Sequence, residues 1–357
     1  MEFTTTYAQN NYPIIVAHSS LNKLTEFTSS YQHTFAFVDA SVYQLWKSKI
    51  DQLVTAQAMT CITIPSGEQV KYFSYYEEYL ELLLSYHPTR NTCLVAIGGG
   101  ATGDFVGFLA ATLLRGVDFI QVPTTLLAHD SSIGGKVGIN TKQGKNLVGA
   151  FHRPKAVLYD LDFLETLPEN EILSGYAEVY KHALLRNENA TKALENQYPS
   201  QVELKSLKQI ETYLIQGIQT KLQIVVEDEK EKGQRQFLNL GHTFGHAVEY
   251  HHRLPHGYAV MIGILYQFIV SNILFNTSFN LQHYYRYFKS LGYPLEIIAS
   301  FQFEPLYALM LHDKKNDADG VRMVLLKDIG SPIAVHVNHN ILHQAFTQLK
   351  QLHKEVN

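Results

Sequence analysis

The chain has 357 residues, a length that corresponds to about two domains. Its 29 basic and 33 acidic side chains leave a formal charge of −4, and so mild a balance excludes a strongly basic nucleic-acid-binding or membrane-surface protein. The two cysteines, Cys61 and Cys93, are too few for a disulfide framework, and no secretory signal opens the chain, so we expect a cytoplasmic protein.

The first half of the chain alternates between two hydrophobic patterns. Short apolar runs predict strands at residues 34–39, 59–64, 92–97, 119–122 and 156–159. Helical spacing between them predicts helices at residues 41–57, 71–86 and 104–114. Because alternating strands and helices are typical of a parallel sheet, we expect a Rossmann-like α/β domain over residues 1–165.

The pattern changes after residue 165. Helical spacing predicts helices at residues 169–185, 206–226, 243–251, 258–275 and 281–291. A short strand pair is expected at residues 323–326 and 333–337. The sequence therefore predicts a second, mainly α-helical domain over residues 166–357.

One long segment, residues 254–285, contains no charged side chain. Its most apolar part, residues 258–275, is close to the minimum length of a membrane span. Gln267, Ser271 and Asn272 interrupt it, and no other segment matches it. We favour a helix buried in the helical domain over a membrane span.

A glycine motif, Gly98, Gly100 and Gly103, matches G-x-G-x-x-G between a predicted strand and a predicted helix. Glycines let the backbone approach a pyrophosphate, and the helix N-terminus supplies free N–H donors. A tight turn without a ligand is the alternative. The usual ribose-binding acid lies about 20 residues downstream. Asp118 comes only 15 residues after Gly103, so Asp39, at the end of its own strand, is the better candidate.

Residues 123–146 combine glycines with lysines and have no long apolar run, which is typical of a loop that wraps an anion. Lys136 and Lys145 are candidates for binding phosphate as point charges. Gly-Lys pairs are also common on protein surfaces, so both interpretations stay open.

Histidine is unusually frequent, at 17 residues, and three histidines cluster in the second half. His242 and His246 are spaced i and i+4 on one predicted helix face, and His256 follows ten residues later. Glu178 and Lys181 share a face of an earlier helix. Three ligands with one open position form a catalytic zinc site, and spacing alone nominates the three histidines. Hydrogen-bonded core histidines are the alternative.

Basic side chains recur at Lys221, Arg235, Lys314 and Lys315, and the first two lie near an acidic run at residues 227–231. A solvated helix face and a carboxylate-binding site are both compatible with this spacing.

Long motifs lie in order along nearly the whole chain, at residues 98–107, 123–146, 174–181, 238–246, 255–257 and 312–315. Together they resemble the 3-dehydroquinate synthase family of the sugar phosphate cyclase superfamily. The resemblance implies a phosphorus–oxygen lyase of the shikimate pathway, which supplies chorismate and the aromatic amino acids. The implied substrate is 3-deoxy-D-arabino-heptulosonate 7-phosphate, and the products are 3-dehydroquinate and phosphate.

The resemblance also implies NAD and one divalent metal ion, zinc or cobalt. NAD⁺ transiently oxidises a substrate hydroxyl, phosphate is eliminated, the hydride returns, and an intramolecular aldol reaction closes the ring. The cofactor is thus recycled, and the metal polarises the substrate oxygen. A cytoplasmic homodimer, with no nucleic-acid or membrane partner, is implied as well.

The resemblance assigns roles to individual side chains. The implied metal ligands are Glu178, His242 and His256, whereas His246 contacts the substrate phosphate. The implied catalytic residues are Asp130, Lys136, Lys181, Arg235, Asn239 and His246. The implied substrate-binding residues are Lys145, Asn146, Lys221, one of Lys314 and Lys315, and Arg115, which reaches across a dimer interface. The implied NAD contacts are Asp39, Ser66, Gly67, Glu68, Gln69, Val70, Lys71, Gly100, Ala101, Thr102, Gly103, Asp104, Thr124, Thr125, Lys136, Lys145, Phe163, Leu164, Glu165 and Thr166.

Three other functions stay open at this point. A related cyclase acts on a sugar phosphate without a carboxylate, whereas Lys221 and Arg235 favour a substrate that has one. A polyol dehydrogenase releases NADH and has no use for the phosphate-binding set of Lys136, Lys145, Asn146 and Lys314. A non-catalytic nucleotide-binding protein does not need metal ligands.

Overall fold

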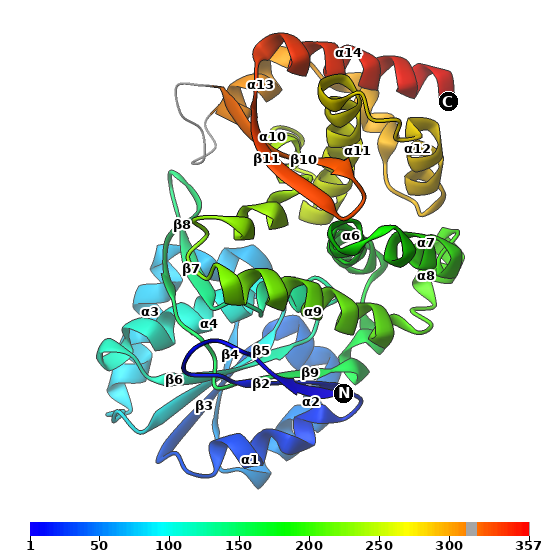
Figure 1. Cartoon of the computed structure of the whole chain (residues 1–357). Helices are drawn as coiled ribbons and strands as arrows, with labels where there is room; N and C mark the ends of the chain where they lie inside the picture. The colour runs from blue at the N-terminus through cyan, green and yellow to red at the C-terminus, as the bar shows by residue number, and fades with distance from the viewer. Residues whose placement is uncertain (312–319, 357) are drawn as a thin grey trace. The chain divides into compact units, whose positions relative to one another are not determined.

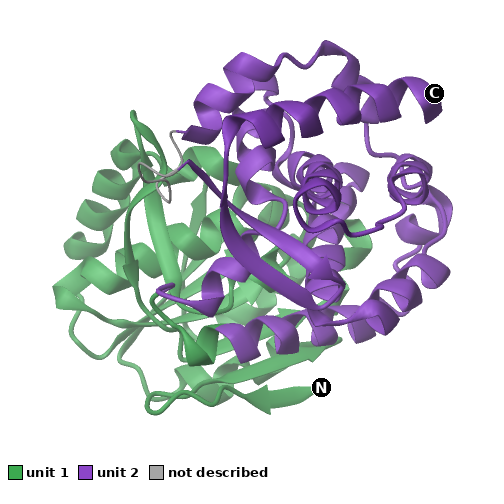
Figure 2. Cartoon of the chain, turned by 45° about the horizontal axis from the view of Figure 1, so that its top comes forward, with its two compact units in different colours: residues 1–167, 225–230 green, residues 168–224, 231–357 purple. Residues whose placement is uncertain are grey.

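The computed structural model describes residues 1–311 and 320–356, so Lys314 and Lys315 lie outside the described residues. The chain divides into two compact units (Figure 2). The first contains residues 1–167 and 225–230, and the second contains residues 168–224 and the chain from residue 231 onward.

The first unit is built on a seven-stranded sheet (Figure 1). Its strands lie in the order β1 (Glu2–Thr4), β2 (Pro13–Ala17), β9 (Ala156–Asp160), β6 (Asp118–Pro123), β5 (Thr92–Gly98), β3 (His33–Asp39) and β4 (Thr60–Ile64). Every neighbouring pair is parallel except β1 with β2. The predicted parallel α/β fold is confirmed, and within this sheet the sequence analysis missed the pair β1 and β2 at one edge.

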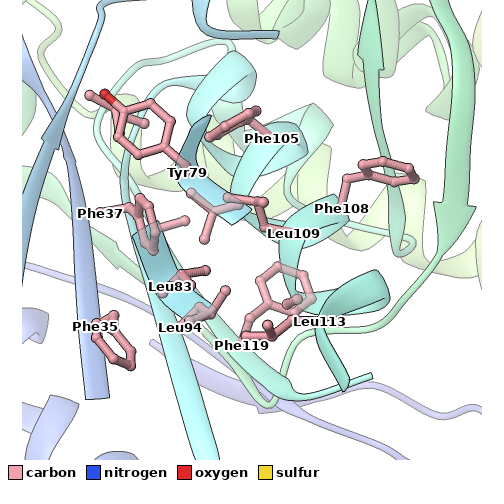
Figure 3. Packing of buried hydrophobic residues seen from close by; sticks show 14 of the residues in the cluster. Phe35, Phe37, Tyr79, Leu83, Leu94, Phe105, Phe108, Leu109, Leu113 and Phe119 are labelled. Carbon is pink, nitrogen blue, oxygen red and sulfur yellow. The ribbon is translucent and has the colours of Figure 1, made fainter. Parts of the chain in front are cut away.

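Helices cover both faces of this sheet, as continuous apolar strands require. Phe35 and Phe37 of β3 pack on one face in a core shared with α3 and α4 (Figure 3). The alternate residues Ala36 and Val38 pack on the other face in a core shared with α1 and α2. The four helices are α1 (Leu24–Thr28), α2 (Ala40–Ala56), α3 (Phe73–Ser85) and α4 (Gly100–Thr112). The sheet therefore lies between two apolar cores.

Two predicted helix starts in this unit are wrong. The helix expected from residue 71 begins at Phe73, because Tyr72 is extended with ψ 145°. Gly67–Lys71 form a separate 3-10 helix, η2, before it. The helix expected from residue 104 begins at Gly100, so the glycine motif itself forms its first turn.

The expected loop over residues 123–146 is also wrong. It contains a short helix and most of a hairpin: α5 (Ala128–Ser131) and the antiparallel strands β7 (Lys136–Thr141) and β8 (Gly144–Phe151). Val137 and Ile139 are buried in the same core as α4. This short apolar strand was hidden among glycines and lysines.

The second unit is mainly helical, as predicted. Its helices are α6 (Glu169–Arg186), α7 (Glu188–Gln197), α8 (Gln201–Lys205), α9 (Ile210–Glu227), α10 (His242–His252), α11 (His256–Phe275), α12 (Leu281–Ser290), α13 (Phe303–Leu311) and α14 (His339–Val356). The end of α9 belongs to the first unit. The expected strand pair is confirmed as β10 (Val321–Asp328) and β11 (Ser331–Val337), which pair antiparallel.

The uncharged segment forms α11, and 72% of its most apolar window is buried inside the protein. It packs against α6, α10, α14 and β10, as expected of a core helix. Glycines allow a very close crossing with α10. An ideal Cβ at Gly245 would lie 3.0 Å from the carbonyl oxygen of Ala259, and one at Gly263 would lie 1.9 Å from that of Gly241.

Candidate functional site

Three side chains from three helices of the second unit converge on one point. Glu178 lies in the middle of α6, His242 is the first residue of α10, and His256 is the first residue of α11. The Nε2 atoms of His242 and His256 lie 3.3 Å and 3.4 Å from Oε1 of Glu178. The close crossing of α10 and α11 brings the two histidines together.

The second nitrogen of each histidine ring has its own acceptor. Nδ1 of His242 faces the carbonyl oxygen of Leu240 at 3.0 Å, and Nδ1 of His256 faces Oε2 of Glu249 at 2.8 Å. In the neutral rings each Nδ1 therefore carries the proton, and each Nε2 directs a lone pair toward Glu178. One buried carboxylate and two imidazoles fit a divalent ion such as zinc and leave positions for a substrate.

The charges around this point also favour a cation. Burial by itself raises the pKa of Glu178, but Lys181 and the two histidines lower it well below its usual value. Burial lowers the pKa of His242. Burial lowers that of His256 as well, yet its hydrogen bonds to Glu178 and Glu249 raise the pKa to about 10. Two carboxylates thus stabilise positive charge at His256.

His246, which spacing alone nominated as a ligand, is exposed and belongs to a second group with Glu249 and His256. The first group consists of the buried Glu178 together with His242 and His256. The candidate ligand atoms of each group lie within 4.8 Å of one another. Sequence reasoning gave Glu249 no role. Its position seven residues after His242 was the available signal, because residues seven apart share a helix face.

Three basic residues nominated in the second unit are buried. Lys181, Lys221 and Arg235 have only 1%, 6% and 2% of their surface exposed. A solvated charged face is therefore wrong for Lys221 and Arg235, and buried cations require anionic or polar partners. Asn239 donates a hydrogen bond to Oε1 of Glu231 at 2.9 Å, which adds a carboxylate that the sequence analysis did not nominate.

In the first unit, the glycine motif lies where the strand order reverses. The chain runs from β3 outward to β4 and returns to β5 on the other side of β3. Open parallel sheets bind nucleotides at the carboxyl ends of the strands that flank such a reversal. Here those ends carry Asp39 on β3 and Gly98 on β5.

The glycines of this motif are required by packing. Helix α4 begins directly after Gly99, its N-cap. An ideal Cβ at Gly98 would lie 2.4 Å from the hydroxyl oxygen of Thr102, and one at Gly103 would lie 2.7 Å from the side-chain oxygen of Gln121. Gly99 and Gly100, at the start of α4, therefore have no side chain that could cover the free backbone N–H groups there.

Three buried hydroxyls surround the motif. Those of Thr102, Thr124 and Ser131 have no hydrogen-bond partner within the described parts of the chain. The backbone N–H of Thr124 donates to the carbonyl oxygen of Gly98 at 3.0 Å, so this hydroxyl is held beside the motif. Buried hydroxyls together with a helix N-terminus fit the pyrophosphate of a dinucleotide such as NAD.

Asp39 caps α2 and ties two loops together. Its Oδ1 accepts hydrogen bonds from the backbone N–H of Ser41 at 2.9 Å and from the hydroxyl of Ser66 at 2.6 Å. Its Oδ2 accepts from the backbone N–H of Gly67 at 3.4 Å. The nominated residues Asp39, Ser66 and Gly67 therefore lie together, and the ribose contact of Asp39 stays a prediction.

Lys71 is a buried hub, with 1% of its surface exposed. Its Nζ donates to Oδ2 of Asp104 at 2.7 Å and to Oδ1 of Asn146 at 2.5 Å. Asn140 donates to Oε2 of Glu68 at 2.8 Å and accepts from the backbone N–H of Asn146 at 3.0 Å. Residues nominated for NAD and for substrate thus share one hydrogen-bond network.

Burial limits how some of the residues implied for NAD can contact it. The side chains of Val70, Phe163 and Leu164 lie in the core, so only their backbone can contact a nucleotide. The hydroxyl of Thr166 accepts a hydrogen bond from Trp46 Nε1 at 2.9 Å. The side chains that are at least partly exposed include Gln69, Ala101, Arg115, Thr125, Asp130, Lys136, Lys145 and Glu165.

Comparisons with known proteins agree over the whole chain. Residues 61–174 match the family model described as 3-dehydroquinate synthase N-terminal, and residues 175–316 match 3-dehydroquinate synthase C-terminal. A 3-dehydroquinate synthase of Staphylococcus epidermidis is 60% identical over 354 residues, which cover 99% of this chain and 100% of that protein.

Two solved structures share the fold at 24% identity. One is 2-deoxy-scyllo-inosose synthase complexed with carbaglucose-6-phosphate, NAD⁺ and Co²⁺, with a TM-score of 0.87 over 98% of this chain and 100% of that one. The other is the 2-epi-5-epi-valiolone synthase ValA from Streptomyces hygroscopicus subsp. jinggangensis with NAD⁺ and Zn²⁺, with a TM-score of 0.86 over 97% and 99%. On the family models and the full-length identity, the chain belongs to the 3-dehydroquinate synthase family.

Proposed function

We propose that the chain converts 3-deoxy-D-arabino-heptulosonate 7-phosphate to 3-dehydroquinate and phosphate, in the shikimate pathway. One observation carries the proposal. The carboxylate and two imidazoles of a metal centre converge in a chain that is 60% identical, from end to end, to a protein named for this activity. The fit of the first unit to a dinucleotide supports the NAD requirement.

When bound, NAD⁺ supplies reversible oxidation of a substrate hydroxyl, and a divalent ion held by Glu178, His242 and His256 supplies polarisation of its oxygen. Lys181 keeps Glu178 ionised through their ion pair. Arg235 and Lys221 bind the substrate carboxylate, for which the planar guanidinium of an arginine is well suited. His246, which is exposed beside Glu249, moves a proton at its ring nitrogen as phosphate leaves.

In the first unit, Lys136, Lys145 and Asn146 of the β7–β8 hairpin bind the substrate phosphate. Lysine ammonium groups neutralise a phosphate as point charges. Asn146 has a left-handed backbone, with φ 55°, and its hydrogen bond with Lys71 holds its amide in place. The hairpin therefore presents these groups in a defined geometry.

The substrate carboxylate separates this proposal from its nearest alternative. The solved 2-deoxy-scyllo-inosose synthase shares the fold and was crystallised with carbaglucose-6-phosphate, which has no carboxylate. Lys221 and Arg235 are nominated for the substrate carboxylate, and the planar guanidinium of Arg235 can bind a carboxylate through two parallel hydrogen bonds. A preference for carboxylate-bearing substrates over plain sugar phosphates would support that role.

The test incubates the purified protein with the heptulosonate phosphate, NAD⁺ and zinc, and follows phosphate, 3-dehydroquinate and NADH in one sample. We expect equal amounts of phosphate and 3-dehydroquinate with no net NADH, and almost no product from His242→Ala. Phosphate release only from sugar phosphates that lack a carboxylate would favour another cyclase. NADH accumulation with a simple polyol would favour a dehydrogenase.

We also propose that the protein works as a cytoplasmic homodimer. Strand β8 exposes Leu147, Val148 and Phe151, with 44%, 39% and 48% of their surfaces accessible. Such apolar patches are typical of interaction surfaces. Arg115 is exposed on an unusual backbone, with φ 69° directly after Leu114 at φ 51°. Its exposed cation is available for a contact to a phosphate bound by a partner subunit.

A mixing experiment tests the contribution of Arg115 to the partner subunit. Arg115→Ala and His242→Ala proteins should each be nearly inactive alone. After unfolding and refolding together, half of the dimers are mixed and each mixed dimer has one complete site, so about a quarter of wild-type activity should return. No recovery in mixed dimers verified by mass would contradict the shared site.

A further inference from the structure

We infer that Glu249 is a positioning residue of the metal centre, because its carboxylate fixes the tautomer and the ring orientation of His256. The inference rests on the proposed metal centre and adds a side chain that coordinates nothing itself. Glu249 acts only through the histidine.

The geometry places His256 between two carboxylates. Its Nδ1 lies 2.8 Å from Oε2 of Glu249, and its Nε2 lies 3.4 Å from Oε1 of Glu178. The Glu249 side chain is 15% exposed, so little water competes for this hydrogen bond. An acceptor at Nδ1 leaves Nε2 as the nitrogen that faces the metal, and a charged acceptor makes Nε2 a stronger donor to it.

The two histidines are held by different means. Nδ1 of His242 faces the backbone carbonyl of Leu240, two residues earlier, so its acceptor is supplied by the helix start itself. His256 starts α11 and its side chain is 31% exposed, against 13% for His242. Its acceptor comes from a side chain on the neighbouring helix. Substitution of Glu249 therefore removes the hold on His256 and leaves the hold on His242 intact.

The chain offers a matched control for this contact. Oε2 of Glu195 lies 2.9 Å from Nε2 of His283, and the Glu195 side chain is also 15% exposed. This pair lies in the same unit and involves none of the metal ligands. Because Oε1 of Glu195 also accepts from the hydroxyl of Tyr180 at 2.6 Å, Glu195→Gln reports what removal of a half-buried glutamate charge with its histidine and tyrosine partners does to the unit in general.

The test measures zinc affinity by competition with a chromophoric chelator for the wild type, Glu249→Gln, Glu249→Ala and Glu195→Gln. We expect zinc to bind about 10- to 100-fold more weakly to Glu249→Ala, less weakly to Glu249→Gln, and unchanged to Glu195→Gln. The amide of glutamine still accepts from Nδ1 but carries no charge, which explains the order. Far-UV circular dichroism of the metal-free proteins verifies that each variant is folded.

Cobalt provides a second readout that a merely structural role would not move. The visible absorption of bound Co²⁺ should shift in Glu249→Gln and stay unchanged in Glu195→Gln. Only the first substitution changes the hydrogen bond of a proposed metal ligand, His256. Wild-type affinity and an unshifted spectrum in Glu249→Gln would overturn the inference while the metal centre stands. Equal weakening by Glu195→Gln would also overturn it. A wild-type protein that binds no zinc would overturn the metal centre itself.

Discussion

His242 and His256 each direct Nε2 toward Glu178 while a second acceptor holds Nδ1. The spacing of the histidines predicted a metal site but selected His246, because Glu178 lies 64 residues before His242 and no periodicity links them. Only the resemblance to a family brought in the carboxylate. Glu249 escaped both lines of reasoning, since a residue that acts through a ligand carries no motif of its own.

Replacement of His242 by alanine should remove the metal and almost all activity. Loss of one of three ligands leaves the ion weakly bound. Without the ion, the negative charge that develops on the substrate oxygen is not stabilised, and turnover should fall by about 100-fold or more. Zinc per chain, measured by mass spectrometry of the metal, should drop in parallel. The control is His283→Ala, whose histidine pairs with Glu195. Full zinc content in His242→Ala would remove this residue from the ligand set.

Asp39 combines a structural and a predicted cofactor role, and two substitutions separate them. Asp39→Ala loses the cap of α2 and should cost about 1 kcal/mol of unfolding free energy in urea. Asp39→Asn keeps an acceptor for Ser41 and Ser66 but should still weaken NAD binding about tenfold in a fluorescence titration, because the charge facing the ribose hydroxyls is gone.

Asn280 caps α12 through the backbone N–H of His283, so Asn280→Ala is the matched control. It should lower stability without changing NAD affinity. Wild-type NAD affinity in Asp39→Asn would show that Asp39 serves only the fold.

At the scale of elements, the long helices and buried strands were predictable because their periods of 3.6 and 2 are clear in the sequence. The β7–β8 hairpin was not, because its apolar residues are few and glycines separate them. The close crossing of α10 and α11 was equally hidden. It depends on glycines whose importance appears only when the facing backbone is known.

Gly263→Ala should therefore damage the second unit. Its added methyl group would lie 1.9 Å from the carbonyl oxygen of Gly241, directly before His242, so α10 must move away. We expect a loss of about 1–3 kcal/mol in urea unfolding of the metal-free protein, together with weaker zinc binding. Gly144→Ala is the control, because its Cβ would meet only the flexible Leu147 side chain. Equal stability of the two variants would contradict this account of the crossing.

At the scale of the whole molecule, each unit presents its own binding elements. The first holds the glycine motif at a reversal of strand order, and the second holds the candidate metal ligands on α6, α10 and α11. The hydrophobic pattern predicted an α/β part followed by a helical part. The return of residues 225–230 to the first unit was not predictable, because Arg153 pairs with Glu229 across a long separation in sequence.

Hydrogen exchange should distinguish the two units. With either ligand alone at 100 times its dissociation constant, stabilisation is about 2.7 kcal/mol, equivalent to about 100-fold slower exchange through opening of the bound unit. NAD should protect η2 and the first turns of α4, and zinc should protect α6 and the first turns of α10 and α11. Protection of the α4 peptides by zinc alone would contradict this separation.

The two proposed histidine ligands each begin a helix, and only Arg253–Pro255 separates those helices along the chain. An ion bound there cross-links the start of α10, the start of α11 and the middle of α6. A cell starved of zinc would then lose more than turnover. In chains without the metal ion, these three helices would separate more often, and proteases would degrade such chains sooner. Zinc supply would then determine the lifetime of the enzyme as well as its activity.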